Sequence, residues 1–323
     1  MKKMEISDSV GKKLAHDVIE YGPKQKRVLF ERGHQIQESD IEKMKDSGNY
    51  FVFISEGKEE GVHEDEAASR MAEASVGKNL TVLRPRKGRV RILSEVPGLL
   101  KAKTEVIKEV NLTDPFIFAL KGNNTGVRKR EEVASAKIAP LVTEENKVKE
   151  IEELLERNKP VLEVVPPKVT KIGLIITGTE IYEGRIEDAF EPTLKEKLNK
   201  YGLEITKTTI LPDEENKIKN KILEFHEKKY DLILVTGGMA VDSKDVTPSA
   251  IKKTGAEIIS RGIPIFPGNM LMISKLGNSY ILGIPACVLP DEKTSFDIIL
   301  PRVLAKEKLN KEDIAGLGDG GLL

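Results

Sequence analysis

The regular alternation of apolar runs and amphipathic segments after residue 166 constrains the fold most strongly. Residues 171–177 and 231–235 are short apolar runs, typical of strands buried on both faces of a parallel sheet. Residues 190–201 and 214–229 carry apolar side chains at helical spacing. This order predicts an α/β fold: a three-layer α/β/α domain with a mostly parallel sheet and helices on both faces.

Further segments extend the pattern to the C-terminus. The expected elements are strands at 203–211, 257–260 and 280–284, a helix capped by Thr247 that ends at Gly255, and a final helix at 294–305. Pro248 suits the first turn of the capped helix, because its missing N–H would have no partner there. The domain therefore occupies residues 166–323.

The chain before residue 166 differs in character, because short β-rich runs alternate there with a few helices. The expected elements are strands at 51–54 and 115–120, helices at 63–75 and 144–158, and a hairpin of 82–86 with 89–93. Pro166 and Pro167 remove two donors and force extended backbone, as in a linker. We expect a small α+β region at 1–60, a β-rich middle domain at 61–165 and the α/β domain at 166–323.

Composition excludes several classes of protein. In 323 residues, 39% are hydrophobic, and 52 Lys and Arg balance 52 Asp and Glu. Packed cores are therefore possible, and nucleic acid is not an expected partner. One Cys and four dispersed His form no disulfide framework and no zinc spacing. Without a signal sequence or a membrane-spanning run, we expect a cytoplasmic protein with no membrane partner.

Three loops with Gly or Pro follow predicted strands of the α/β domain, where ligands of open α/β sheets bind. They are Thr177-Gly178-Thr179-Glu180, then Thr236-Gly237-Gly238 leading to Asp245 and Thr247, and Pro267-Gly268 together with the turn at Pro285. Adjacent glycines after a buried strand can form an anion-binding nest of backbone N–H groups. Their position predicts an anion site at this edge of the sheet.

Asp245 allows two interpretations. It lies just before the predicted helix, where a carboxylate either caps the helix or holds Mg²⁺ against a phosphate. The alternative for the whole loop is an ordinary strand-to-helix turn capped by Asp245 and Thr247. The chain has no P-loop, no G-x-G-x-x-G after the first strand and no G-x-S-x-G elbow, so these nucleotide and hydrolase sites are unsupported.

The order and spacing of these motifs resemble the molybdopterin-binding domain family of molybdenum cofactor biosynthesis. The matching residues are Thr177-Gly178-Thr179-Glu180-Ile181, Gly184 to Asp188, Leu211-Pro212-Asp213-Glu214, Asp231-Leu232-Ile233, Thr236-Gly237-Gly238, Asp245-Val246-Thr247-Pro248, Pro267-Gly268 and Ile284-Pro285. The resemblance covers roughly residues 168–310. The chain also resembles a stand-alone bacterial molybdopterin-binding subfamily, to which residues 1–165 are similar more weakly.

The resemblance implies a three-layer α/β fold, with molybdopterin or a nucleotide and Mg²⁺ as cofactors. Family members include an enzyme that adenylylates molybdopterin with Mg-ATP and one that inserts molybdate. By this likeness Gly237, Gly238 and the amides of Thr177–Glu180 hold phosphate or pterin, and Asp213 and Asp245 serve the metal and adenylyl transfer. We expect an anionic pterin or nucleotide as ligand, and a homo-oligomer.

Two positions depart from the family pattern. Ala240 stands where a Ser is common, and Ala286 follows Pro285 where a Gly is usual. Three functions stay open: an enzyme of adenylyl transfer or metal insertion, a carrier or sensor that binds the cofactor without catalysis, and a nucleotide pyrophosphatase-like relative of the competence-damage type. The two departures favour weak or absent turnover.

Three further features have simpler interpretations. The cluster of Arg84, Arg86, Lys87, Arg89 and Arg91 is expected to be a charged, solvated hairpin, and it has no aromatic residues for base stacking. The run 63–66, His-Glu-Asp-Glu, fits the acidic first turn of a helix better than a metal cluster. Cys287 lies in an apolar stretch, as packed cysteines do.

Overall fold

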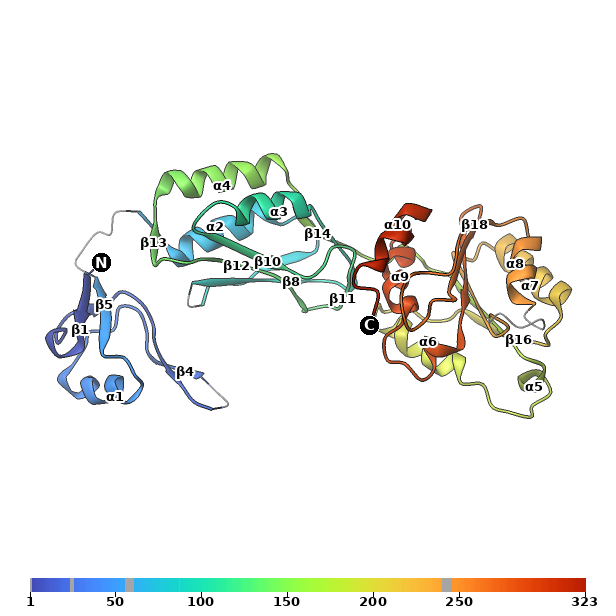
Figure 1. The fold of residues 1–323 in the computed structure, drawn as a ribbon, viewed down its shortest axis with the longest axis horizontal. Helices are drawn as coiled ribbons and strands as arrows, with labels where there is room; N and C mark the ends of the chain where they lie inside the picture. Colours follow the sequence, from blue (N-terminus) through green and yellow to red (C-terminus); the bar gives the residue numbers. More distant parts are fainter. Residues whose placement is uncertain (1, 24–25, 56–60, 87, 240–245) are drawn as a thin grey trace. The chain divides into compact units, whose positions relative to one another are not determined.

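A computed structural model describes residues 2–23, 26–55, 61–86, 88–239 and 246–323 (Figure 1). The chain forms two compact units. The first unit comprises Met1–Leu93, Lys103–Lys121 and Glu132–Leu162, and the second comprises Ser94–Ala102, Gly122–Glu131 and Glu163–Leu323. The division into three parts at 60 and 165 stays a prediction.

The N-terminal part of the first unit combines two small sheets with short helices. Its elements are β1 (Lys2–Glu5), β2 (Lys13–Leu14), β3 (Val18–Tyr21), β4 (Lys26–Phe30), α1 (Ile41–Asp46), β5 (Phe51–Ser55) and the 3₁₀ turns Ile6–Asp8 and Glu38–Asp40. The sheet order is β1-β5-β2, and β3 pairs with β4. Ile6, Met44, Val52 and Ile54 are buried together in one core cluster.

The rest of the first unit is a four-stranded sheet with helices on one face (Figure 1). Its elements are β6 (Val62–His63), α2 (Glu64–Ser75), β7 (Leu80–Val82), β8 (Arg89–Ser94), α3 (Thr104–Asn111), β10 (Phe116–Leu120), β12 (Glu132–Ile138), β13 (Val142–Thr143) and α4 (Glu145–Arg157). The order is β10-β12-β8-β7, and β6 pairs with β13. The Arg70 guanidinium on α2 contacts Glu145 at 3.0 Å on α4, which fastens the two helices.

The second unit contains the predicted α/β sheet. Its elements are β15 (Ile172–Thr177), α5 (Thr179–Tyr182), α6 (Phe190–Asn199), β16 (Lys207–Leu211), α7 (Glu215–Glu227), β17 (Leu232–Thr236), α8 (Thr247–Lys253), β18 (Glu257–Arg261), β19 (Met272–Leu276), β20 (Ser279–Ile284), α9 (Ser295–Leu304), α10 (Lys311–Ala315) and the 3₁₀ turns Ala286–Val288 and Gly316–Gly318. A further small sheet has the order β11-β9-β14, formed by Gly126–Val127, Gly98–Ala102 and Leu162–Val165.

The six strands lie in the order β16-β15-β17-β20-β19-β18. β16, β15, β17 and β20 are parallel, whereas β19 is antiparallel to both of its neighbours. The expectation of a mostly parallel α/β sheet is confirmed. β19 was not predicted, because Ser274 and Lys275 interrupt its apolar run.

Two apolar cores cover the two faces of this sheet. On one face, Leu174 and Leu234 pack with residues of α6 and α9. On the other face, Ile175 and Val235 pack with residues of α7 and α8. Successive side chains of a strand point to opposite faces of the sheet, and here both faces are buried. The strands are therefore continuous apolar runs in the sequence.

Two predicted boundaries need correction. Val246 is the N-cap of α8, so Thr247 is its first residue and not its cap. β16 begins at Lys207 and not at residue 203, because residues 203–206 form no regular structure. Gly255 follows the C-cap of α8 with φ +81°, as expected of a helix stop. Within the described ranges, no helix is long and apolar enough to cross a membrane.

Candidate functional site

The strand order reverses direction at β15, which makes the carboxyl edge of the sheet next to β15 a topological switch point. The chain passes from β15 to β16 on one side, and then to β17 on the other side of β15. Ile176 pairs with Thr236, so the loops that begin at Gly178 and Gly237 leave the sheet next to each other. Open α/β sheets bind ligands at such a switch point.

Gly237 and Gly238 bring the loop after β17 close to β15 and α8 at this switch point. Their φ angles are +84° and +56°, which L side chains rarely adopt. A Cβ on Gly237 would lie 2.1 Å from the carbonyl oxygen of Thr177, and one on Gly238 would lie 3.1 Å from Thr247 Oγ1. The φ angle and the contact with Thr177 together require glycine at position 237, and the φ angle favours glycine at position 238.

Three buried threonines surround the two glycines. Thr177 Oγ1 and Thr247 Oγ1 lie 3.4 Å apart, at the end of β15 and the start of α8. The Thr236 hydroxyl is fully buried and has no hydrogen-bond partner among the residues that the structure describes. Burying a hydroxyl without a partner costs free energy, so a hydrogen bond to this oxygen would be favourable.

Asp213 braces the loop after β15. Its Oδ2 accepts hydrogen bonds from the Thr179 amide at 3.0 Å and from the Thr179 hydroxyl at 3.3 Å. Gly178, with φ +153°, turns the chain into the single-turn helix α5, on which Glu180 is exposed. The structure thus brings Asp213 to Thr179 but occupies one carboxylate oxygen in the process.

The third predicted loop lies at the same edge, farther along the sheet. Pro267-Gly268 joins β18 to β19, and Gly268 has φ +105°. It packs on the start of α9, where the Ser295 amide donates to Pro267 O at 3.0 Å and Ser295 Oγ donates to Gly268 O at 2.5 Å. Buried Pro285 follows β20, whose last residue pairs with Thr236. Two strands, β20 and β19, therefore separate β17 from β18 in the sheet order.

Two residues of the hypothesis, Ala240 and Asp245, lie outside the described residues. Ala286 is exposed in the turn after Pro285. Among the described residues, no three His, Cys, Asp or Glu side chains group together as they would around a metal ion. Asp213 is thus the one carboxylate of the predicted metal pair whose surroundings can be described.

The structure also places the three features that the sequence analysis interpreted as structural. His63 is the N-cap of α2, and its Nδ1 accepts from the Asp65 amide at 3.2 Å, which confirms the acidic helix start. Arg89 and Arg91 both pair with Glu132 across β8 and β12. Burial raises the pKa of the Cys287 thiol, as expected for a packed cysteine and not for a nucleophile.

Sequence reasoning missed two features. Ser295 had no signal of its own, because its partner Gly268 lies 27 residues earlier. The second is a hollow beside α6 and α9, lined in part by residues 123–131. The run Arg128-Lys129-Arg130 was visible in the sequence, but nothing local indicated that it meets residues near 200 and 300.

The fold and these loops define an open α/β domain with glycine-bearing loops at the carboxyl edge of its parallel strands. Residues 173–305 match the sequence model of the family described as "Probable molybdopterin binding domain". Residues 3–56 match a second family, described as a domain of unknown function.

Similar proteins cover only part of the chain. The molybdopterin molybdenumtransferase of Haemophilus influenzae is 27% identical over 140 residues, which is 41% of this chain and 34% of that protein. A CinA-like protein of Fusobacterium nucleatum is 35% identical over 83 residues, which is 26% of this chain and 20% of that protein. The chain thus spans about a third or less of the length of these relatives.

Solved structures resemble the C-terminal part. The tungsten cofactor synthesizing protein MoaB from Pyrococcus furiosus has a TM-score of 0.35 and 22% identity, covering 42% of this chain and 94% of that one. The protein CinA from Thermoplasma acidophilum has a TM-score of 0.37 and 15% identity, covering 42% of this chain and 98% of that one.

Proposed function

We propose that this protein binds molybdopterin, or a phosphorylated derivative of it, at the switch point of its α/β domain, and that it acts in the synthesis or handling of the molybdenum cofactor. The contact of Gly237 with Thr177 carries the proposal. Two consecutive glycines with positive φ can form an anion-binding nest of backbone amides. The match of residues 173–305 to the molybdopterin-binding family model supports a pterin as the ligand.

The proposed roles follow from the positions of the residues. The amides of Gly237 and Gly238, with the hydroxyls of Thr177 and Thr236, would hold phosphate oxygens. Asp213 would hold Thr179 in place, so that its loop with Gly178 and Glu180 forms the second wall. Pro267, Gly268 and Pro285 would shape the far end of the same edge, where the rest of the ligand lies.

Magnesium is a weaker part of the proposal. The residues within the described ranges do not make a magnesium site by themselves, because Asp213 Oδ2 is already engaged by Thr179 and no cluster of three ligands exists there. A second carboxylate, Asp245, would be needed. The proposed binding therefore rests on amides and hydroxyls, and no reaction step is assigned to a metal.

The name of the Haemophilus influenzae relative supports a transferase, and the CinA-like matches support a nucleotide-processing relative as the second candidate. We favour a binding protein of low turnover, since Ala286 stands where the family usually has glycine and would lack its close backbone approach. We further propose that the protein self-associates, which light scattering would test.

One set of assays separates these functions. The full chain is titrated with molybdopterin in a calorimeter, with and without Mg²⁺, and release of pyrophosphate from ATP is followed with and without molybdopterin. Binding without turnover is the expected result. Molybdopterin-dependent pyrophosphate release would establish adenylyl transfer instead. Hydrolysis of a dinucleotide in the absence of molybdopterin would favour the second candidate.

A further inference from the structure

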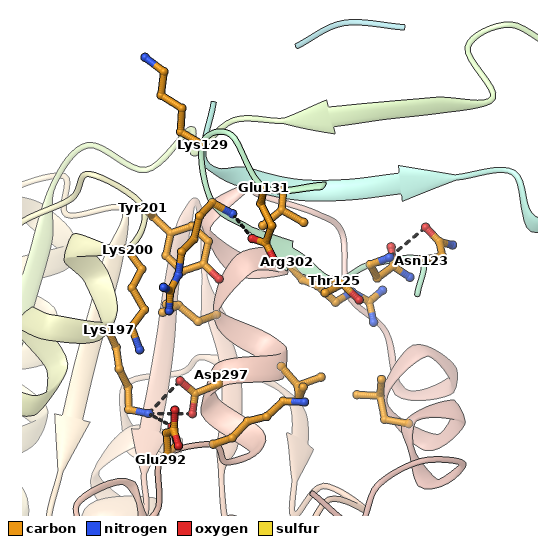
Figure 2. Close-up of a pocket in the computed structure, with 18 of the residues that line it drawn as sticks. Asn123, Thr125, Lys129, Glu131, Lys197, Lys200, Tyr201, Glu292, Asp297 and Arg302 are labelled. Carbon is orange, nitrogen blue, oxygen red and sulfur yellow. Dashed lines mark hydrogen bonds and ion pairs between the residues drawn. The ribbon is translucent and has the colours of Figure 1, made fainter. Parts of the chain in front are cut away.

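A hollow of about 650 Å³ lies in the second unit, and none of its lining residues belongs to the glycine loops (Figure 2). We name it the α6–α9 hollow, after the two helices that supply Lys197, Asp297 and Arg302. Tyr201, just beyond the end of α6, and residues 123–131 complete it. Its volume is in the range of sites for small organic ligands.

The hollow carries a surplus of positive charge in a chain of zero net charge. Seven basic and three acidic residues contribute atoms to its lining, and of the basic ones Lys129 directs its amine away from it (Figure 2). Of the acidic ones, Asp297 is engaged by Lys197 Nζ at 2.8 Å, and Glu131 accepts from the Arg128 amide at 2.6 Å. Two of its three carboxylates are thus already occupied by the protein itself.

Several of the basic groups, in contrast, are unpaired. The side chains of Arg128 and Lys293 make no ion pair or hydrogen bond with any residue that the structure describes, and Lys200 has only Glu196 at 3.7 Å. Arg128 and Lys200 also line an adjoining hollow of about 350 Å³. Like charges gathered without partners repel one another, and an anion between them relieves that repulsion.

Part of the lining of the hollow is apolar. Val127, Ile298 and Leu300 line it together with Tyr201. A Cβ on Gly126 would lie 2.2 Å from Tyr201 Oη, so the backbone at Gly126 packs against the hydroxyl end of this side chain. Burial, with the nearby Asp297 and Glu131 carboxylates, raises the pKa of Tyr201 to about 12, which keeps its hydroxyl protonated as a donor.

Three ion pairs hold these walls in place. Lys197 is almost fully buried and contacts both oxygens of Asp297 at 2.8 Å. Glu307 joins Lys101 on β9 to Arg302 on α9, each at 2.6 Å. The site is therefore built before a ligand arrives, which lowers the entropic cost of binding.

We propose that the α6–α9 hollow binds a small organic polyanion, in which an uncharged ring lies against Tyr201 and phosphate groups contact Arg128, Lys200 and Lys293. A nucleoside diphosphate is the simplest compound of this class. The site is separate from the glycine loops and does not depend on the function proposed for them. Arginine suits this role, because its planar guanidinium forms paired hydrogen bonds with phosphate.

The neighbouring Lys129 provides a matched control. Its amine points away from the hollow, although it carries the same charge one residue further along the chain (Figure 2). Arg128 and Lys129 are both exposed, so neither substitution should affect folding. The hydrogen bond from the Arg128 amide to Glu131 involves the backbone and survives in Arg128→Ala.

The test titrates the full chain with ADP, with adenosine and with inorganic phosphate, at low salt. We expect ADP to bind best, Arg128→Ala to weaken it at least tenfold, and Lys129→Ala to change it less than threefold. Asp213→Ala, which alters the glycine-loop region, should leave ADP affinity unchanged, and this separates the two sites. Equal ADP affinity in wild type and Arg128→Ala, no ADP binding, or a loss confined to a folded Asp213→Ala would each overturn the proposal. So would tighter binding of a single-stranded oligonucleotide.

Discussion

The carbonyl oxygen of Thr177 lies 2.1 Å from the position that a Cβ would take on Gly237. These residues are 60 positions apart and belong to loops that leave adjacent parallel strands. The backbone at the switch point is therefore packed against backbone, with no room for a methyl group. We therefore expect this contact to affect both the stability of the protein and its affinity for the ligand.

Gly237→Ala should destabilise the protein by about 2–4 kcal/mol, because it adds a clash to the strain of a positive φ. Gly255→Ala is the matched control, since Gly255 has φ +81° and nothing lies within 4 Å of its Cβ position. It should cost only about 1 kcal/mol. Urea unfolding of both variants gives the comparison, and equal costs would show that the Thr177 contact is not restrictive.

Substitutions at Asp213 distinguish two roles of this carboxylate, one in holding the loop at Thr179 and one as a metal ligand. Asp213→Asn keeps an oxygen that can accept from the Thr179 amide, so molybdopterin affinity should stay within threefold of the wild type. Asp213→Ala removes both hydrogen bonds and should weaken binding about tenfold, at about 1 kcal/mol for such bonds. A metal role predicts another result: Asp213→Asn weakens binding as much as Asp213→Ala does, and a chelator lowers the affinity of the wild type to that of the variants. The charge of Asp213 would then serve a cation.

Asp231 should make stability depend on pH. Burial would raise the pKa of this carboxyl, but hydrogen bonds from Lys306, Thr170 and Lys171 outweigh it and lower the pKa to about 2 from 3.8. Because the folded-state pKa is lower, the stabilisation is complete above about pH 5 and disappears as the pH falls towards 2. It amounts to about 2 kcal/mol at neutral pH.

Urea unfolding between pH 6 and pH 2.5 tests this linkage. The free energy of unfolding of Asp231→Asn should fall less steeply with acid than that of the wild type. Asp319→Asn, at an exposed position near the C-terminus, serves as the control and should follow the wild type. If the free energy of unfolding falls equally with pH in all three proteins, Asp231 does not contribute to acid sensitivity.

Two lysines on α6 should differ sharply in their contribution to stability. Lys197→Met leaves Asp297 without its buried partner and should cost about 2–3 kcal/mol. Lys195 pairs with Glu191 at 2.8 Å, but its side chain is 52% exposed, so Lys195→Met should cost at most about 0.5 kcal/mol. Thermal or urea unfolding measures both, and similar values would mean that the Lys197 pair contributes little.

The sequence predicted the parallel core of the fold because buried strands such as β15 and β17 are continuous apolar runs. It did not predict β19, whose polar residues conceal a strand that pairs antiparallel to β20. It also did not indicate that residues 94–102 and 122–131 group with the C-terminal unit, because their partners lie far along the chain.

The candidate site could be predicted only in part. The glycines and the polar residues of the loops were visible, because chemistry at a strand end depends on local sequence. Two contacts arise from strand order and not from local sequence: Thr179 with Asp213, 34 residues apart, and Thr177 with Thr247, 70 residues apart. The α6–α9 hollow could not be predicted for the same reason, because its walls come from distant segments.

Calorimetric titration of molybdopterin into the full chain, compared with Gly237→Ala and Gly255→Ala, tests the central claim most directly. Circular dichroism first establishes that each variant is folded, and Asp213→Ala replaces Gly237→Ala if that variant is not. The account predicts binding by the wild type and Gly255→Ala, and at least a tenfold loss in the switch-point variant. Equal affinity in all proteins, or no binding by the wild type, would contradict it.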